Sequence, residues 1–272
     1  MKKIIFLNSW GESPNQILYR YSKQTPQNKG IWKNLKGVSN INEADYYIVL
    51  EGYNGNLPLD KTIFIKREPD FIRKHNPKYK HVIDWNYTNC GITWWVNRTY
   101  DQLKELQPPA KIKKVSCVVS SKHSHRLNYV KSLFKGDSPI DLYGRGHNKE
   151  FYGENYKGGL NYDGKCKLRG LLEYEYSVVL ENSQQKNYFT EKLADSFLSW
   201  TLPIYWGCPN IVDFFPENSY HLLDIKHNNP LQQIKEIINT PVDIESLGFA
   251  RDIILDEYNI WEVINKKINE IL

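Results

Sequence analysis

Cysteine is scarce in this 272-residue sequence, and its four residues form no Cys-x-x-Cys pair. That spacing marks thiolate metal sites and redox pairs, whereas dense cysteine marks disulfide scaffolds. The pattern therefore favours free thiols in a reducing compartment. The four residues are Cys90, Cys117, Cys166 and Cys208.

Long apolar runs are also missing, and none approaches the roughly 18 residues that a membrane-spanning helix needs. The apolar stretch at residues 4–7 is too short for the core of a signal peptide, and Asn8 interrupts it. We therefore expect a cytoplasmic protein. Residues from 260 onward carry an apolar stripe at helical spacing, which predicts a helix packed on the domains, with peripheral membrane contact as the alternative.

Charge of one sign is not concentrated anywhere in the chain. The net charge is +5, and the basic clusters are small, at residues 111–114 and 266–267. The sequence contains no RNA- or DNA-reading motif, so we expect no nucleic-acid partner. A modest positive balance suits an anionic small-molecule substrate.

The segment from residue 174 to residue 220 organises the rest of the chain. An uninterrupted apolar run at 177–180 is typical of a strand buried on both faces of a parallel sheet. Polar residues follow at once, a helical pattern starts at Thr190, and a second apolar strand is predicted at 202–205. Polar groups at strand ends and helix starts predict a site for an anionic ligand, most simply phosphate.

Buried strands are predicted on both sides of a break near the middle of the chain. Paired prolines interrupt helix and sheet within residues 106–110, which we take as the linker. The sequence thus predicts an α/β fold with an N-terminal domain (1–108), a C-terminal domain (109–250) and a C-terminal helix (251–272). The expected strands are 2–7, 44–50, 62–65, 81–83, 115–119, 140–143, 177–180, 202–205 and 221–223; residues 12–40 are irregular, with a helix that the pattern does not place.

The organising segment resembles the donor-binding motif of the α1,3/4-fucosyltransferase family, glycosyltransferase family ten. The family carries a pattern close to YxFxLxFENSxxxxYxTEK, then a helix, a strand containing proline and a Gly-x-Pro turn. The matching residues here are Tyr174, Leu180, Glu181, Asn182, Ser183, Tyr188, Thr190, Glu191, Lys192, Pro203, Gly207, Pro209 and Asn210.

The resemblance implies a GT-B fold, with two Rossmann-like domains facing each other across a cleft. It also implies an inverting enzyme that moves L-fucose from GDP-fucose to an acceptor glycan, commonly at the 3-position of N-acetylglucosamine. The sequence has no Asp-x-Asp motif of the kind that holds a divalent ion, so we expect no metal and no cofactor. Transfer from a different GDP-sugar, or a relative that binds nucleotide or glycan without catalysis, are the alternatives.

Glu68 is the candidate catalytic base. It follows the strand at 62–65 and precedes Pro69, and the family places a base glutamate near a proline in this region. The intervening serine of the family motif is absent here. The alternative is a surface glutamate that pairs with Lys66 or Arg67.

Donor contacts are expected mainly from the C-terminal domain. Arg126 and Lys192 would clamp the diphosphate, because an arginine fork donates two hydrogen bonds to phosphate oxygens. By resemblance Glu191 binds ribose or fucose hydroxyls. An ordinary solvated arginine and an ordinary charged helix start are the alternatives. The other donor contacts implied by the resemblance are Asn182, Tyr188, Tyr143 and Gly144.

Trp94 and Trp95 follow the base motif closely. An aromatic pair can stack on a sugar ring, so we expect these residues in the acceptor site. Two tryptophans buried in the core are the alternative.

Overall fold

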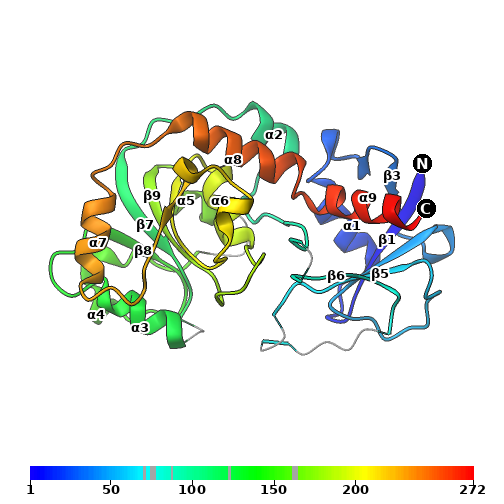
Figure 1. Ribbon diagram of the computed structural model, residues 1–272, viewed down its shortest axis with the longest axis horizontal. Helices are drawn as coiled ribbons and strands as arrows, with labels where there is room; N and C mark the ends of the chain where they lie inside the picture. Colours follow the sequence, from blue (N-terminus) through cyan, green and yellow to red (C-terminus); the bar gives the residue numbers. More distant parts are fainter. Residues whose placement is uncertain (70–71, 74–77, 87, 122–123, 161–164) are drawn as a thin grey trace.

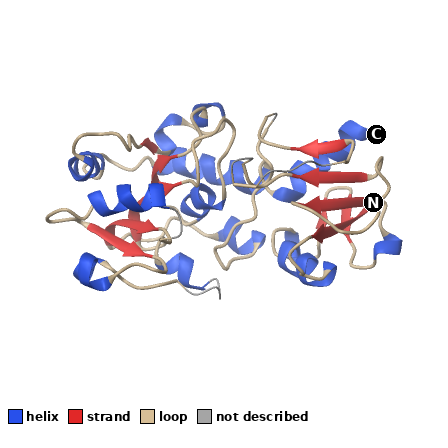
Figure 2. Cartoon of the chain, turned by 90° about the horizontal axis from the view of Figure 1, so that it is seen from below, coloured by secondary structure: helices blue, strands red, loops and turns tan. Residues whose placement is uncertain are grey.

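The computed structural model describes residues 1–272 except 70–71, 74–77, 87, 122–123 and 161–164. Figure 1 shows two lobes side by side, the blue N-terminal strands in one and the green and yellow strands of the middle of the chain in the other. Within the described part, the strands form one sheet in each lobe, and the change of sheet falls between residues 83 and 113. Figure 2 shows the two sheets from below, each with its own helices.

The N-terminal sheet is built around β1 (Lys2–Asn8), in which residues 4–7 are buried. The strand order is β2-β3-β1-β4-β5-β6. The pairs from β3 to β6 are parallel, so the carboxyl ends of these strands meet at one edge, where parallel sheets bind ligands. The other strands are β2 (Ile31–Trp32), β3 (Leu35–Gly37), β4 (Tyr46–Leu50), β5 (Thr62–Ile65) and β6 (His81–Ile83).

The C-terminal sheet has the order β11-β10-β9-β7-β8, and its described pairs are all parallel. Its central strand β9 (Tyr174–Leu180) is buried at six of seven positions, as its apolar run predicts. Its carboxyl end therefore delivers Glu181 to the ligand-binding edge. The remaining strands are β7 (Lys113–Val118), β8 (Ile140–Tyr143), β10 (Leu202–Trp206) and β11 (His221–Leu222).

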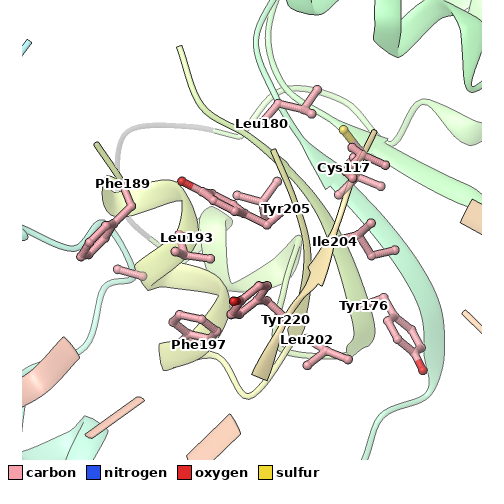
Figure 3. Packing of buried hydrophobic residues seen from close by; sticks show 14 of the residues in the cluster. Cys117, Tyr176, Leu180, Phe189, Leu193, Phe197, Leu202, Ile204, Tyr205 and Tyr220 are labelled. Atoms are coloured by element: carbon pink, nitrogen blue, oxygen red, sulfur yellow. The ribbon is translucent and has the colours of Figure 1, made fainter. Parts of the chain in front are cut away.

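Helix α6 (Glu191–Leu198) packs on the sheet beside β10, and its side chains join the largest core cluster. Figure 3 shows Leu193 and Phe197 of the helix in this cluster with Leu202 and Ile204 of the strand. Leu193 and Phe197 are four residues apart, so they share the face that the sequence pattern predicts. This packing fixes the start of α6 at the sheet edge.

The remaining helices lie around the two sheets. Helix α1 (Pro14–Ser22) starts at a capping box in which the Ser13 hydroxyl accepts from the Gln16 amide. It is the helix that the sequence analysis expected within residues 12–40 but could not place. The others are α2 (Tyr100–Glu105), α3 (Ser124–Ser132), α4 (Lys149–Tyr152), α5 (Lys165–Arg169), α7 (Pro230–Ile237), α8 (Ile244–Asp256) and α9 (Ile260–Ile271).

The last two helices cross from one lobe to the other (Figure 1). Helix α8 packs on α6, whereas α9 packs on the N-terminal core, where the Trp261 ring meets Phe6 edge to face at 5.3 Å. Between them Asn259 caps α9 and donates from Nδ2 to the Gln24 carbonyl at 2.8 Å. The end of the chain thus ties the two lobes together.

Most of the expected strands are confirmed within one to three residues at each end. The sequence did not predict β2 and β3, because two and three residues are too few for a periodic signal. Lys33, in the turn between these two strands, has a φ of 50°. This left-handed conformation is usually adopted by glycine or asparagine, so a lysine at this position does not predict the turn. No helix of the described chain is both long and apolar enough to cross a membrane.

Candidate active site

Side chains from both lobes line one cavity of about 300 Å³. The N-terminal lobe contributes residues at the ends of β4 and β5, and the C-terminal lobe contributes the segment from the end of β9 to the start of α6. The structure thereby brings five of the residues predicted from the sequence to one place. They are Glu68, Asn182, Tyr188, Glu191 and Lys192.

Glu68 reaches this cavity from just beyond the end of β5. Its Oε2 atom is buried and has no hydrogen-bond partner among the described residues. Burial raises the pKa of Glu68 above its ordinary value, the Lys192 charge opposes the rise, and Glu191 and Glu51 add to it. A half-buried carboxylate with a raised pKa and an unoccupied oxygen is suited to accept a proton from a bound hydroxyl.

A second glutamate, Glu51, holds the chain segment that carries Glu68. It follows the end of β4, and its Oε1 accepts hydrogen bonds from the backbone amides of Arg67 and, at 2.8 Å, of Glu68. Glu51 is 7% exposed and has a φ of 62°, which costs free energy in a residue other than glycine. We infer that the Glu51 carboxylate, carried on a strained backbone, fixes the backbone at Glu68.

Arg67, the residue before Glu68, also lines the cavity. Its Nη2 atom donates to Thr93 Oγ1 at 3.1 Å, and its Nη1 atom donates to the Tyr21 hydroxyl at 3.3 Å. Burial lowers the pKa of Arg67, but Tyr21 and the nearby carboxylates outweigh burial and raise it. Arg67 therefore stays charged beside Glu68.

The start of α6 is assembled on the buried carboxylate of Glu181. Glu181 is fully buried; Oε1 accepts from the Thr190 amide and Oε2 from the Thr190 hydroxyl, both at 2.7 Å. The Thr190 hydroxyl in turn accepts from the Lys192 amide, which is an N-cap contact. Burial raises the pKa of Glu181, whereas Lys192 and the Thr190 bonds lower it, and the net direction is upward.

Lys192 and Glu191 form an ion pair at the cavity wall. Lys192 Nζ lies 3.1 Å from Glu191 Oε1 and 3.4 Å from Glu181 Oε2. Burial raises the pKa of Glu191, but the charges of Lys192 and Lys167 and the hydrogen bonds from Lys192 and Thr190 outweigh it and lower the pKa to about 2. Glu191 is therefore an ionised hydrogen-bond acceptor, which suits sugar hydroxyls, and Lys192 is a fixed cation beside it.

Tyr188 lies where the two lobes meet. Its ring packs edge to face on Trp85 with centroids 4.8 Å apart, and both residues line the cavity. Burial raises the pKa of the Tyr188 hydroxyl, so it stays protonated. The neighbouring loop is held across the lobes, because Asn187 Nδ2 donates to the Trp85 carbonyl at 2.7 Å and Asn89 Nδ2 donates to the Phe189 carbonyl at 2.8 Å.

Arg126 is buried in the C-terminal lobe, and its role as a diphosphate clamp stays a prediction. It is 5% exposed, and Nη1 donates to the Leu180 carbonyl at 2.9 Å, at the carboxyl end of β9. Its Nε atom has no partner among the described residues. Burial lowers the pKa of Arg126, and Glu181 opposes this. Among the described lining residues of the cavity, Arg126 is absent.

Tyr143 and Gly144 stand at the end of β8, also outside the described lining of this cavity. The Tyr143 hydroxyl shares a 2.8 Å hydrogen bond with the Tyr174 hydroxyl inside the lobe. Gly144 has a φ of 140°, and a Cβ there would lie 1.7 Å from the Val119 carbonyl oxygen. Close approach of two strand ends therefore requires glycine at this position.

The two adjacent tryptophans have different environments. Trp94 is 9% exposed and donates from Nε1 to the Arg98 carbonyl, whereas Trp95 is 42% exposed. Both line a second cavity of about 220 Å³ that shares Arg67 and Thr93 with the first. Trp94 is thus largely buried and Trp95 presents an exposed ring, and the acceptor-site role of the pair stays a prediction.

The sequence analysis did not single out Glu51, Arg67 or Trp85. Glu51 could have been found by the signal that marked Glu68, since it is a polar residue directly after a buried strand.

The described residues contain no group of three or more histidine, cysteine or acidic side chains that could hold a metal ion. The described cysteines, Cys90, Cys117 and Cys208, are free and buried.

Part of this chain matches a known protein family. Residues 108–240 match the family model described as glycosyltransferase family 10 (fucosyltransferase), C-terminal part. The alpha-(1,3)-fucosyltransferase FucT of Helicobacter pylori is 37% identical over 76 residues, which are 28% of this chain and 16% of that protein. Alpha-(1,3)-fucosyltransferase B of Drosophila melanogaster is 35% identical over 127 residues, 46% of this chain and 28% of that protein. The matched segments thus span less than a third of these two relatives.

Solved structures resemble the whole chain. A crystal structure of alpha1,3-fucosyltransferase with GDP-fucose aligns over 99% of this chain and 90% of its own, with 17% identity and a TM-score of 0.54. A DNA-modifying beta-glucosyltransferase aligns over 99% and 97%, with 14% identity and a TM-score of 0.52. This likeness confirms the predicted α/β fold of two facing domains, which the resemblance implied as GT-B. Residues 108–240, just under half of this chain, thus match the C-terminal part of glycosyltransferase family 10, the fucosyltransferases.

Proposed function

We propose that this chain is an inverting glycosyltransferase that moves L-fucose from GDP-fucose to a hydroxyl of an acceptor glycan. The observation that supports it most is the meeting of Glu68 with Lys192 and Glu191 in one cavity. A proton acceptor from one lobe thereby faces a cation and a hydroxyl acceptor from the other. Such a site can hold two sugars in line between its walls.

Glu68 is the base in this mechanism. As the acceptor oxygen attacks the anomeric carbon of fucose, Glu68 takes the proton of that hydroxyl, and the bond to the diphosphate breaks on the opposite face. Glu51 keeps the Glu68 backbone in place through two amide hydrogen bonds. Only the ionised form of Glu68 can act, so its raised pKa sets the acid limit of activity.

The departing GDP gains negative charge as the bond breaks. Lys192 stabilises that charge at the cavity wall, aided by the amides at the start of α6. Arg126 adds positive charge at the end of β9, where it donates to the Leu180 carbonyl. Glu191 accepts hydrogen bonds from donor hydroxyls, while Asn182 and Tyr188 complete the donor pocket. These cations supply the charge stabilisation, so the proposal includes no metal and no cofactor.

The acceptor approaches from the N-terminal lobe, along the wall of Arg67 and Thr93, toward Trp95. We propose an α1,3-type linkage to a glycan that contains N-acetylglucosamine. The relatives named above are alpha-(1,3)-fucosyltransferases, and the solved neighbour was crystallised with GDP-fucose.

Donor screening by thermal shift tests the proposal. A ligand that binds only the folded state raises the melting temperature, and a concentration of 100 Kd contributes about 2.7 kcal/mol. We expect GDP-fucose to raise the melting temperature by about 5 °C or more, and UDP-sugars to leave it unchanged. A larger shift with GDP-mannose would assign another donor, and no shift with any GDP compound would contradict the proposal.

A further inference from the structure

The second cavity, of about 220 Å³, opens directly beside the candidate active site. The two cavities share Arg67 and Thr93, whose side chains are hydrogen-bonded to each other at 3.1 Å. An acceptor whose reacting hydroxyl lies at Glu68 therefore extends into this second cavity. The residues that line the second cavity, within 20–24, at 67 and at 93–98, lie outside the segment that matches the family, so the family match does not say which ligand it binds.

The lining of the second cavity is cationic. It contains Arg20, Lys23, Arg67 and Arg98, and no acidic residue among its described members. Arg20 is neutralised by Glu12, with Nη1 2.7 Å from a carboxylate oxygen. Arg67 is balanced by the glutamates around it. Within the described part of the chain, neither Lys23 nor Arg98 makes an ion pair; the Lys23 ammonium lies over the Tyr19 ring, 5.0 Å from its centroid.

Arg98 is displayed on fixed backbone. The turn at residues 94–98 is closed by the Arg98 amide, which donates to the Val96 carbonyl at 2.7 Å, and by Trp94 Nε1, which donates to the Arg98 carbonyl at 3.0 Å. The Trp95 amide donates to the buried carboxylate of Asp195 in α6 at 2.9 Å. The turn is thus anchored to the helix that carries Lys192, and little ordering is needed when a ligand binds.

The exposed ring of Trp95 gives the same cavity an apolar face. Aromatic rings suit the apolar side of a sugar ring, and an arginine fork suits the oxygens of an anionic group. The combination favours a sugar that carries a negative charge over a neutral one. A neutral acceptor would leave Arg98 and Lys23 without a counter-charge.

We propose that the second cavity is an acceptor subsite specific for a glycan with an anionic group, a carboxylate or a sulfate ester, one sugar away from the reacting hydroxyl. Arg98 and Lys23 bind the anion, and Trp95 stacks on the sugar that carries it. This inference rests on the proposed fucosyl transfer and names the substrate class of the same site.

The test compares three acceptors with one backbone: N-acetyllactosamine, its form with the galactose oxidised at C6 to a carboxylate, and its form sulfated at that position. Affinity for GDP-loaded protein is measured by calorimetric titration, and kcat/KM is measured with GDP-fucose as donor. We expect at least one anionic form to exceed the neutral one about tenfold in both readouts, less so at 0.5 M salt. The form that does so identifies the anionic group.

Two double variants provide the control. Arg98→Gln with Lys23→Gln should reduce the anionic preference to about onefold and leave the neutral acceptor within about twofold of its original values. Lys29→Gln with Lys36→Gln removes the same charge at exposed positions outside the cavity and should keep the preference.

Equal affinity and kcat/KM for the three acceptors in the unmodified protein would overturn the inference, as would an anionic preference that survives the loss of Arg98 and Lys23. Neutral acceptor transfer with no anionic preference would leave the proposed function intact. Binding preference without transfer to any acceptor would contradict the proposed function and support the subsite.

Discussion

At the scale of single residues, the central feature is a pair of glutamates on neighbouring strand ends. Glu68 faces the cavity, and Glu51 accepts hydrogen bonds from the Glu68 segment while raising the pKa of Glu68 through its own negative charge. Glu51 therefore positions the proposed base and contributes, after burial and Glu191, to its raised pKa.

Replacing Glu51 by glutamine separates these two effects. The amide oxygen can still accept from the backbone amides of Arg67 and Glu68, but the negative charge is gone, so the pKa of Glu68 should fall. Because the base must be ionised, we expect the acid limb of the kcat/KM profile to move to lower pH in Glu51→Gln. In the unmodified protein this limb should lie above the ordinary glutamate value of about 4.3.

The matched control is Glu43→Gln, at an exposed position away from the cavity. Its acid limb should coincide with that of the unmodified protein. An acid limb that stays in place in Glu51→Gln would show that Glu51 does not act on the proton of the base.

At the scale of elements, the start of α6 depends on one hydroxyl. Thr190 Oγ1 donates to the buried Glu181 carboxylate and accepts from the Lys192 amide and ammonium. Thr190→Val keeps the shape and removes these bonds, which leaves a buried carboxylate short of a donor. We expect the free energy of unfolding to fall by about 1–3 kcal/mol, measured by urea denaturation.

Thr190→Ser retains the hydroxyl and should lose less than about 1 kcal/mol of unfolding free energy. Equal losses in the valine and serine variants would mean that the methyl group, and not the hydrogen bonds, stabilises this helix start.

Some features of these elements could be predicted from the sequence and others could not. Strand β9 and helix α6 could be predicted because an apolar run and a helical period follow directly from burial. The grouping of Asn182, Glu191 and Lys192 with Glu68 followed from strand ends and from the family resemblance. The burial of Arg126 at the carboxyl end of β9 could not be predicted, because helical spacing locates a residue on α3 and says nothing about how deep its side chain reaches.

At the scale of the whole molecule, α9 belongs in space to the lobe that begins the chain. Its apolar stripe predicts burial, but a stripe does not identify the surface that covers it. The structure supplies the partner: Trp261 is fully buried against β1 and α1, and its Nε1 atom donates to the Tyr21 carbonyl at 2.9 Å.

Removing this ring tests the role of α9 as a tie between the lobes. Trp261→Ala should lower the free energy of unfolding by about 3–5 kcal/mol, because it leaves a cavity and an unpaired carbonyl in the N-terminal core. Lys266→Ala, an exposed position on the same helix, should change it by less than about 0.5 kcal/mol. Similar losses in both variants in a denaturant titration would mean that the helix contributes no specific packing.

The two lobes together form the proposed active site, since neither the base nor the donor contacts suffice alone. The most direct measurement is the rate of fucose transfer from GDP-fucose by Glu68→Gln, alongside its affinity for GDP. The mechanism predicts a fall in kcat of about 100-fold or more, because general-base catalysis contributes roughly 10²–10⁴-fold, with GDP affinity unchanged within about twofold. Transfer at the original rate with intact GDP binding would contradict the assignment of Glu68 as the base.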